Sequence, residues 1–110
     1  MEIERTSAGL FYHATPMENL QSINVCGLTI SQDGYVHLTK DEVAAVRYCA
    51  STGARKIACF TVEIDDLNDV VEIVDFGSEI FLCKSYAYAK DVPSARIKGI
   101  SLWDLSKMPL

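Results

Sequence analysis

One short pattern occurs twice in the first half of the chain, and it limits where helices can form. Each copy is an apolar run that ends in histidine, followed by one residue and then a threonine: Leu10-Phe-Tyr-His13-Ala14-Thr15 and Val36-His37-Leu-Thr39. Each threonine precedes a glutamate by three residues, which is the capping-box signature of a helix start. The sequence therefore predicts two strand-to-helix corners, each with a histidine at the end of its strand.

The residues after each threonine predict one helix. Pro16 suits a first helical turn, and Gly27 stands where a left-handed C-terminal cap is expected, which predicts a first helix over about 16–26. Apolar residues then recur at helical spacing from Val43 to Ala50, and Ser51-Thr-Gly53 ends this second helix.

The remainder of the chain is typical of strands. Runs of high β propensity lie at 56–64, 70–74, 79–83, 85–88 and 97–103, with short turn-forming stretches between them. Helices in the first half and strands in the second predict an α+β fold, with a mixed or antiparallel sheet and two principal helices. The 110 residues fit a single domain spanning 1–110.

Composition excludes some classes of function. The formal net charge of -5 disfavours nucleic acid as the main partner, because phosphate binding requires a basic surface. No apolar run approaches the roughly 20 residues that span a bilayer, and no signal peptide is evident, so we expect a cytoplasmic protein without membrane contact. The four cysteines lack C-x-x-C or zinc-finger spacing, so we expect buried free thiols and no bound metal.

The two histidines are the first candidates for chemistry. A strand-to-helix corner gathers backbone N–H groups and a positive helix end, which suits an anionic or polar ligand. His13 and His37 could equally be structural residues held by the backbone. Two H-x-T segments, with Thr15 and Thr39, also fit a two-histidine phosphoesterase, in which the histidines act as acid and base and the threonines hold phosphate.

Two further side chains could serve such a site. Tyr48, on the second helix, could stack on a planar heterocycle, although an aromatic residue at this spacing is more often part of a core. Glu79 opens an apolar strand, where a carboxylate could stabilise a developing cation; a solvated edge position is the plainer interpretation.

These segments together resemble the ADP-ribosyltransferase fold family. Residues 10–28 are similar to its opening block of strand, His-Gly-Thr/Ser, helix and Gly-Leu. Residues 36–39 with 45–49 resemble its second block, and Ser78-Glu79-Ile-Phe-Leu resembles its third, in which a glutamate starts a strand. The most similar branches are the mono-ADP-ribosyltransferases of the diphtheria-toxin and poly-ADP-ribose-polymerase type and the tRNA 2′-phosphotransferases.

The resemblance implies NAD as co-substrate and a role for each matching residue. His13 would bind a ribose hydroxyl, and the backbone of Ala14 would hold the nicotinamide amide. His37 would take the catalytic place usually given to tyrosine, and Tyr48 would stack on nicotinamide. Glu79 would be the catalytic carboxylate that favours the oxocarbenium-like transition state. The threonines Thr15 and Thr39 complete the expected cofactor-binding set.

The chain departs from the family pattern in ways that leave several functions open. Alanine replaces the usual glycine at position 14, and His37 replaces tyrosine as in the 2′-phosphotransferase branch, yet the arginines are scattered. We expect ADP-ribosyl transfer to an acceptor, with a protein preferred over a small molecule. An RNA 2′-phosphotransferase, a two-histidine phosphoesterase and a non-catalytic NAD- or ADP-ribose-binding module remain the alternatives.

Overall fold

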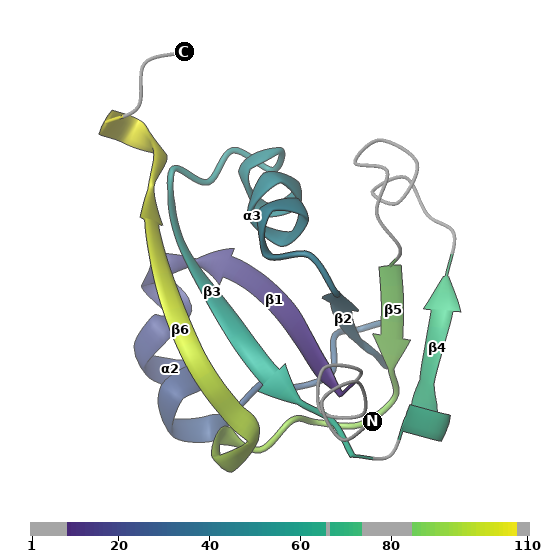
Figure 1. Ribbon diagram of the computed structural model, residues 1–110. Coiled ribbons are helices and arrows are strands. Elements are labelled where there is room, and N and C mark those ends of the chain that lie inside the picture. Colours follow the sequence, from purple (N-terminus) through teal and green to yellow (C-terminus); the bar gives the residue numbers. More distant parts are fainter. Residues whose placement is uncertain (1–8, 66, 74–84, 108–110) are drawn as a thin grey trace, which may run out of the picture.

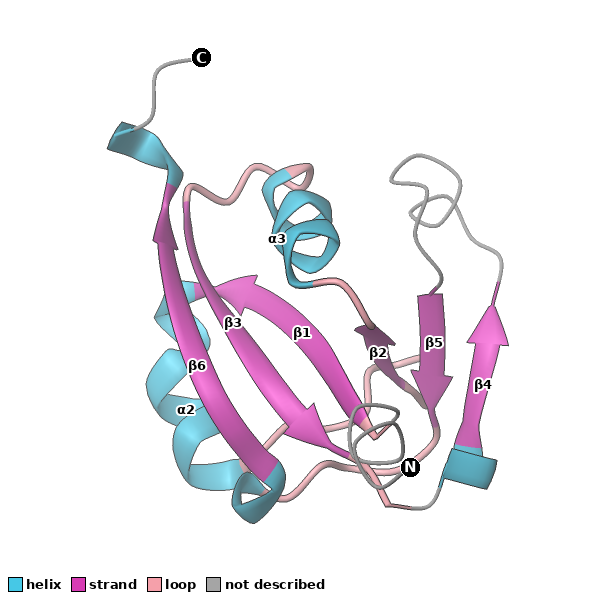
Figure 2. Cartoon of the chain, viewed as in Figure 1, coloured by secondary structure: helices cyan, strands magenta, loops and turns pink. Residues whose placement is uncertain are grey.

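The computed structural model describes residues 9–65, 67–73 and 85–107, which form a six-stranded sheet with an α-helix on each face (Figure 1). The strands are β1 (Leu10–Pro16), β2 (Val36–Thr39), β3 (Lys56–Glu63), β4 (Val70–Ile73), β5 (Ser85–Tyr88) and β6 (Ile97–Asp104). The helices are α2 (Leu20–Cys26) and α3 (Glu42–Ala50), with short 3-10 turns at Met17–Asn19, Leu67–Asp69, Ser94–Arg96 and Leu105–Lys107 (Figure 2).

The strand order is β4-β5-β2-β1-β3-β6, and every neighbouring pair is antiparallel. This confirms the predicted α+β class with two principal helices. Neither α-helix in the described part of the chain is long and apolar enough to cross a bilayer.

Two apolar clusters, one on each face of the sheet, hold the helices in place. On the α2 side, Leu20 and Ile23 pack against a cluster that includes Phe11 and Phe60. On the α3 side, the cluster consists of Ala45, Val46, Cys49, Ile57 and Cys59. Phe60 and Ile57, three residues apart on β3, point to opposite faces and are both fully buried. Burying a side chain of this size contributes about 2 kcal/mol.

The first predicted corner is wrong in its details. Strand β1 continues through Thr15 and Pro16, which pair with Ala58 and Ile57 of β3, so Thr15 is not a helix cap. Its side chain is buried, and its hydroxyl accepts a hydrogen bond from Asn19 Nδ2 at 2.9 Å. Seven consecutive pairs along β3 therefore outweigh the local capping signal, and α2 begins only at Leu20.

The second predicted corner is shifted by two residues. Asp41 caps α3, and its carboxylate accepts a hydrogen bond from the N–H of Ala44 at 3.2 Å. Thr39 belongs to β2, and its hydroxyl accepts a hydrogen bond from the N–H of Asp41 at 3.3 Å. Both histidines consequently lie within strands rather than at helix starts.

The C-terminal ends of both α-helices agree with the sequence prediction. Gly27 has φ 81° and donates its N–H to the carbonyl of Ile23 at 2.7 Å, and α3 ends before Ser51 as predicted.

The cysteines agree with the sequence prediction only in part. Cys49 and Cys59 are buried free thiols, as expected. Cys26 is exposed because it lies on the outer side of α2, which contradicts the expectation for that residue. Cys83 lies outside the described residues.

Candidate functional site

The sheet is nearly divided between β1 and β2, and both histidines lie at this division. The two strands share a single residue pair, Tyr12 with Thr39, whereas β1 and β3 share seven. At the register that this pair sets, Ala14 lies opposite His37, yet the two residues are not paired. We refer to this interrupted stretch, from Tyr12 to Ala14 on β1 and from His37 to Thr39 on β2, as the β1–β2 split.

A side chain takes the place of the missing ladder bond. His13 Nδ1 lies 2.7 Å from the carbonyl oxygen of His37. Since a carbonyl oxygen can only accept, Nδ1 carries the proton and Nε2 of a neutral His13 is left as a hydrogen-bond acceptor. The arrangement thus fixes both the ring and its tautomer.

Burial keeps His13 uncharged. The desolvation of the half-buried imidazole lowers the pKa of His13 below its ordinary value of 6.5, against a smaller opposite effect of the bond to the His37 carbonyl. The neighbouring His37 ring lowers the pKa of His13 further, because two positive rings would repel each other. At neutral pH, His13 is therefore a neutral acceptor at Nε2.

The backbone of Ala14 is directed at the split. Residues opposite each other in an antiparallel ladder point their N–H and C=O groups either toward each other or away. His37 points its carbonyl at β1, so Ala14 points its own polar backbone groups at β2, where it has no ladder partner. The methyl group of Ala14 packs on the α3 side of the sheet.

His37 forms a second polar interaction at the β1–β2 split, with Asp33. Its Nε2 lies 2.6 Å from Asp33 Oδ2, and both side chains are about half exposed, at 43% and 50%. Val36 and Leu38 pack in the α2-side cluster, so alternation directs His37 to the opposite side, toward α3. By the same alternation His13 follows Phe11 toward the α2 side, so the two rings reach the split from opposite faces.

Asp33 was not foreseen among the site residues. The turn at 31–35 brings it back onto β2: Gly34 donates to the Ser31 carbonyl at 2.9 Å, and Tyr35 donates its N–H to Asp33 Oδ1 at 3.1 Å. The hydrogen bonds from His37 and from the Tyr35 N–H lower the pKa of the Asp33 carboxyl group. The signal available in the sequence was an aspartate in a Gly-containing turn four residues before a strand histidine.

The other expected site residues are placed unevenly. Tyr48 is half exposed on α3, the helix that packs mainly on β1 and β3 and also reaches β2, so its ring is not part of the core. Thr39 closes the split beside Tyr12, whereas the buried hydroxyl of Thr15 is engaged by Asn19. Glu79, the expected catalytic carboxylate, lies outside the described residues.

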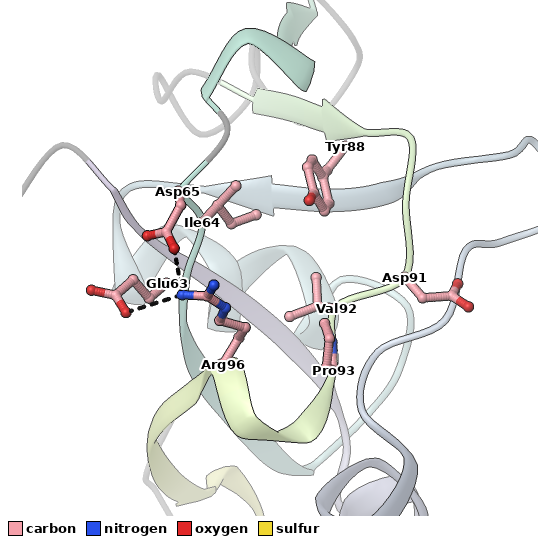
Figure 3. Close-up of a pocket in the computed structure, with 8 residues that line it drawn as sticks. All are labelled: Glu63, Ile64, Asp65, Tyr88, Asp91, Val92, Pro93 and Arg96. Carbon is pink, nitrogen blue, oxygen red and sulfur yellow. Dashed lines mark ion pairs between the residues drawn. The ribbon is translucent and has the colours of Figure 1, made fainter.

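A separate pocket, of about 340 Å³, lies at the end of β3 (Figure 3). Its lining is Glu63, Ile64, Asp65, Tyr88, Asp91, Val92, Pro93 and Arg96. Figure 3 shows Arg96 reaching toward Glu63 and Asp65, at 3.7 and 2.6 Å. The pocket contains none of the residues that the sequence singled out.

No three His, Cys, Asp or Glu side chains within residues 9–65, 67–73 and 85–107 come together as a metal site. The histidine pair of the split is joined through backbone and carboxylate instead.

Comparison with solved structures shows that this α+β fold also occurs in another protein. Protein CC0527 from Caulobacter crescentus is similar over 84% of this chain and 84% of its own, with a TM-score of 0.60 and 15% identity. A double mutant of the same Caulobacter protein matches over the same shares with a TM-score of 0.60 and 14% identity. At this identity the likeness shows a shared fold. No protein-family model matches the chain, and no curated protein matches it.

Proposed function

We propose that the chain binds NAD in the β1–β2 split and transfers its ADP-ribose unit to an acceptor, with a protein as the preferred acceptor. The observation that carries this proposal is the bond from His13 to the His37 carbonyl at 2.7 Å, which joins β1 and β2 where Ala14 has no ladder partner on β2. The resemblance of the sequence to ADP-ribosyltransferases points to the same residues.

Each group in the split suits one part of the co-substrate. The Nε2 of neutral His13 can accept an O–H of a ribose, and the N–H and C=O of Ala14 match the C=O and NH₂ of a carboxamide. The exposed ring of Tyr48 offers a face for the nicotinamide ring. These are neutral, hydrogen-bonding and stacking interactions, as recognition of a nicotinamide riboside requires.

The paired Asp33 and His37 suit the proton that transfer must remove. The bond between C1′ of the ribose and nicotinamide N1 breaks, and its electron pair neutralises the departing pyridinium ring. A lone pair of the acceptor forms the new bond to C1′, and the acceptor proton passes to His37 Nδ1. Asp33 holds the other ring nitrogen at 2.6 Å and stabilises the imidazolium that results.

Glu79 completes the proposal through the sequence resemblance alone. A carboxylate beside the ribose would favour the positive charge that develops at C1′ as nicotinamide leaves. Its assignment rests on the Ser78-Glu79 match, and the mutational test below addresses it directly.

A binding titration followed by a turnover assay tests the proposal. The melting temperature of the full chain is measured with NAD, with ADP-ribose and with a 2′,3′-cyclic nucleotide, and nicotinamide release is then measured by chromatography. We expect NAD to raise the melting temperature and Glu79→Gln to reduce nicotinamide release by roughly 10²-fold or more while NAD still binds. The exposed Glu72 of β4 supplies the matched control, Glu72→Gln, which should retain full turnover.

The other outcomes distinguish the alternatives. Full turnover by Glu79→Gln overturns the catalytic assignment. Hydrolysis of the cyclic nucleotide without NAD identifies a phosphoesterase, and ADP-ribose cyclic phosphate released from 2′-phosphorylated RNA identifies a 2′-phosphotransferase. NAD binding without any turnover identifies a binding module, and no response to any ligand overturns the nucleotide site itself.

A further inference from the structure

Among the residues that the structure describes, strand β6 has a neighbour on one side only. It has eight residues, Ile97–Asp104, and within the described residues it pairs with β3 alone. Two of its large apolar side chains, Ile100 and Leu102, are 42% and 60% exposed. In Figure 1, β6 forms the left border of the sheet, on the side away from β4 and β5. A long apolar edge strand is a template for pairing with another chain.

The free backbone groups of β6 belong to these same exposed residues. Leu105 donates its N–H to the Arg55 carbonyl at 2.7 Å, which continues the β3–β6 register beyond the strand end. Backbone polar groups alternate in direction along a strand, so Ser101 and Trp103 also point theirs at β3. Ile100 and Leu102 accordingly point their N–H and C=O groups away from the sheet.

We infer that two copies of this chain pair antiparallel along β6, with Ser101 of each copy at the two-fold axis. In this register each Ile100 faces Leu102 of the second copy, and each Leu102 faces Ile100. The outward backbone groups of these two residues then meet as hydrogen-bonding partners. Their side chains lie on one face, because Ile100 pairs with Phe60 and Leu102 with Ala58 inside the chain.

The charges at the two ends of β6 favour the same register. Lys98, the extra residue of a bulge in the β3–β6 ladder, lies near one end and Asp104 lies at the other. An antiparallel two-fold pairing about Ser101 therefore brings these opposite charges near each other in both halves. The Lys98 side chain is 48% exposed and its Nζ lies 3.7 Å from Glu63 Oε1, which leaves the amino group within reach of a second carboxylate. On the other face, Gly99 opposes Trp103, a small residue against a large one.

Neighbouring registers lack this complementarity. A pairing centred on Ile100 opposes Lys98 to Leu102, and one centred on Leu102 opposes Asp104 to Ile100. Each would set a charge against an apolar side chain. The partner of β6 is thus a second copy of this chain, paired in a single register.

The contact is small, so the dimer is expected to be weak. Sedimentation velocity of the full chain is measured from about 10 µM to about 1 mM, the range that a contact below the usual size of a stable interface requires. We expect a reversible shift from the mass of one chain to that of two. A sedimenting species that keeps the mass of one chain over this whole range overturns the inference.

Two single variants and their combination test the register. Ile100→Lys and Leu102→Glu each place a charge opposite an apolar residue, and each should raise the dissociation constant by roughly ten-fold or more. The double variant, Ile100→Lys with Leu102→Glu, puts opposite charges face to face in both halves and should restore dimerisation, with a dependence on salt. In the register centred on Ile100, Leu102→Glu would instead face Lys98, and in the register centred on Leu102, Ile100→Lys would face Asp104. Weaker dimerisation in both single variants is therefore specific to the register centred on Ser101.

Controls separate the edge from other surfaces and from unfolding. Val71, exposed on the opposite edge strand β4, supplies the variant Val71→Lys, which should leave self-association unchanged. Far-ultraviolet circular dichroism checks that every variant is folded. If dimerisation survives both single variants, or if only Val71→Lys abolishes it, β6 is not the contact. The experiment needs no nucleotide and is independent of the proposed activity.

Discussion

Leu28 and Val92 exchange two backbone hydrogen bonds, with the N–H of Leu28 at 2.9 Å from the Val92 carbonyl and the N–H of Val92 at 2.7 Å from that of Leu28. This isolated bridge ties the segment after α2 to the segment before β6, residues that are 64 positions apart in the chain. Both side chains are almost fully buried. The bridge therefore anchors the helix to the far end of the sheet.

Gly27 makes this bridge possible, and its replacement should be costly. A Cβ atom on Gly27 would overlap the Val92 carbonyl oxygen and lie 2.8 Å from the Ser94 nitrogen, at a φ of 81°. We expect Gly27→Ala to lower the free energy of unfolding by about 3 kcal/mol or more, measured by urea denaturation. Gly34→Ala and Gly53→Ala share the positive φ but meet open space, and each should cost only about 1 kcal/mol. Equal losses in all three variants would contradict the close approach.

Acidification should destabilise the fold through His13. Burial lowers the pKa of His13 in the folded chain, so the unfolded chain, with an ordinary pKa of 6.5, binds the proton first as the pH falls. Stability is thus full above pH 6.5 and declines below it, until the lowered folded pKa is passed. Urea midpoints measured across this window should fall for the natural chain.

A matched variant isolates this titration. His13→Asn keeps a donor at the position of Nδ1 and removes the ionisable ring, so the decline below pH 6.5 should largely disappear. His37→Gln should retain the decline, since the charge of His37 is the smallest of the causes that shift the pKa of His13. An unchanged slope in His13→Asn would assign the effect to other groups.

Mutation can decide whether Asp41, as in the structure, or Thr39, as the sequence predicted, caps α3. Asp41→Ala should lower the free energy of unfolding by about 1 kcal/mol, because the N–H of Ala44 loses its acceptor. Asp41→Asn should cost only a few tenths of a kcal/mol, since the amide oxygen still accepts. Thermal unfolding monitored by circular dichroism measures both. A larger effect from Thr39→Val, which removes the hydroxyl at nearly constant shape, than from Asp41→Ala would return the cap to Thr39.

The cysteines should differ sharply in reactivity. Burial, with smaller effects of Glu42 and Cys49, raises the pKa of Cys59 to about 12, and burial also raises the pKa of Cys49. Because the thiolate is the reactive form, iodoacetamide should label the exposed Cys26 rapidly and spare Cys49 and Cys59 until the chain unfolds. Peptide mass spectrometry resolves the sites, and prompt labelling of Cys59 in the folded chain would contradict its burial.

Tyr48 should matter for nucleotide binding and little for stability. Its ring is 50% exposed, so Tyr48→Ala should leave the unfolding free energy within about 0.5 kcal/mol. If the ring stacks on nicotinamide, the same variant should weaken NAD binding by roughly ten-fold, measured by calorimetry. Val43→Ala, at a similarly exposed position on α3, provides the control. Equal NAD affinity in the two variants would remove Tyr48 from the site.

Local signals in the sequence predicted the elements better than their junctions. The run at 56–64 was recognisable as a strand, and the structure has β3 at Lys56–Glu63, between β1 and β6. The helix end at Gly27 was recognisable because positive φ favours glycine. The two threonine caps failed because strand pairing extends β1 and β2 through Thr15 and Thr39, and such pairing depends on residues far away in the chain.

The site could be predicted only in part, for a similar reason. The two histidines were selected by their repeated spacing, and the structure brings them together on neighbouring strands. The different hydrogen-bond partners of the two rings were not predictable: a backbone carbonyl holds the His13 ring, and Asp33 holds the His37 ring. Both contacts arise from strand register and from the turn at 31–35, which the spacing of residue types does not encode.

The strand order has a consequence for how the protein can be synthesised. The half-sheet β1-β3-β6 joins residues 10–16, 56–63 and 97–104, so its outer strand leaves the ribosome long after its first. Until β6 emerges, the nascent chain has no partner for the outer edge of β3, whose Ile57, Ala58 and Phe60 are among the most buried residues of the finished fold. An incomplete chain that stops before β6 would expose that edge of β3 to other nascent chains, which is a route to aggregation.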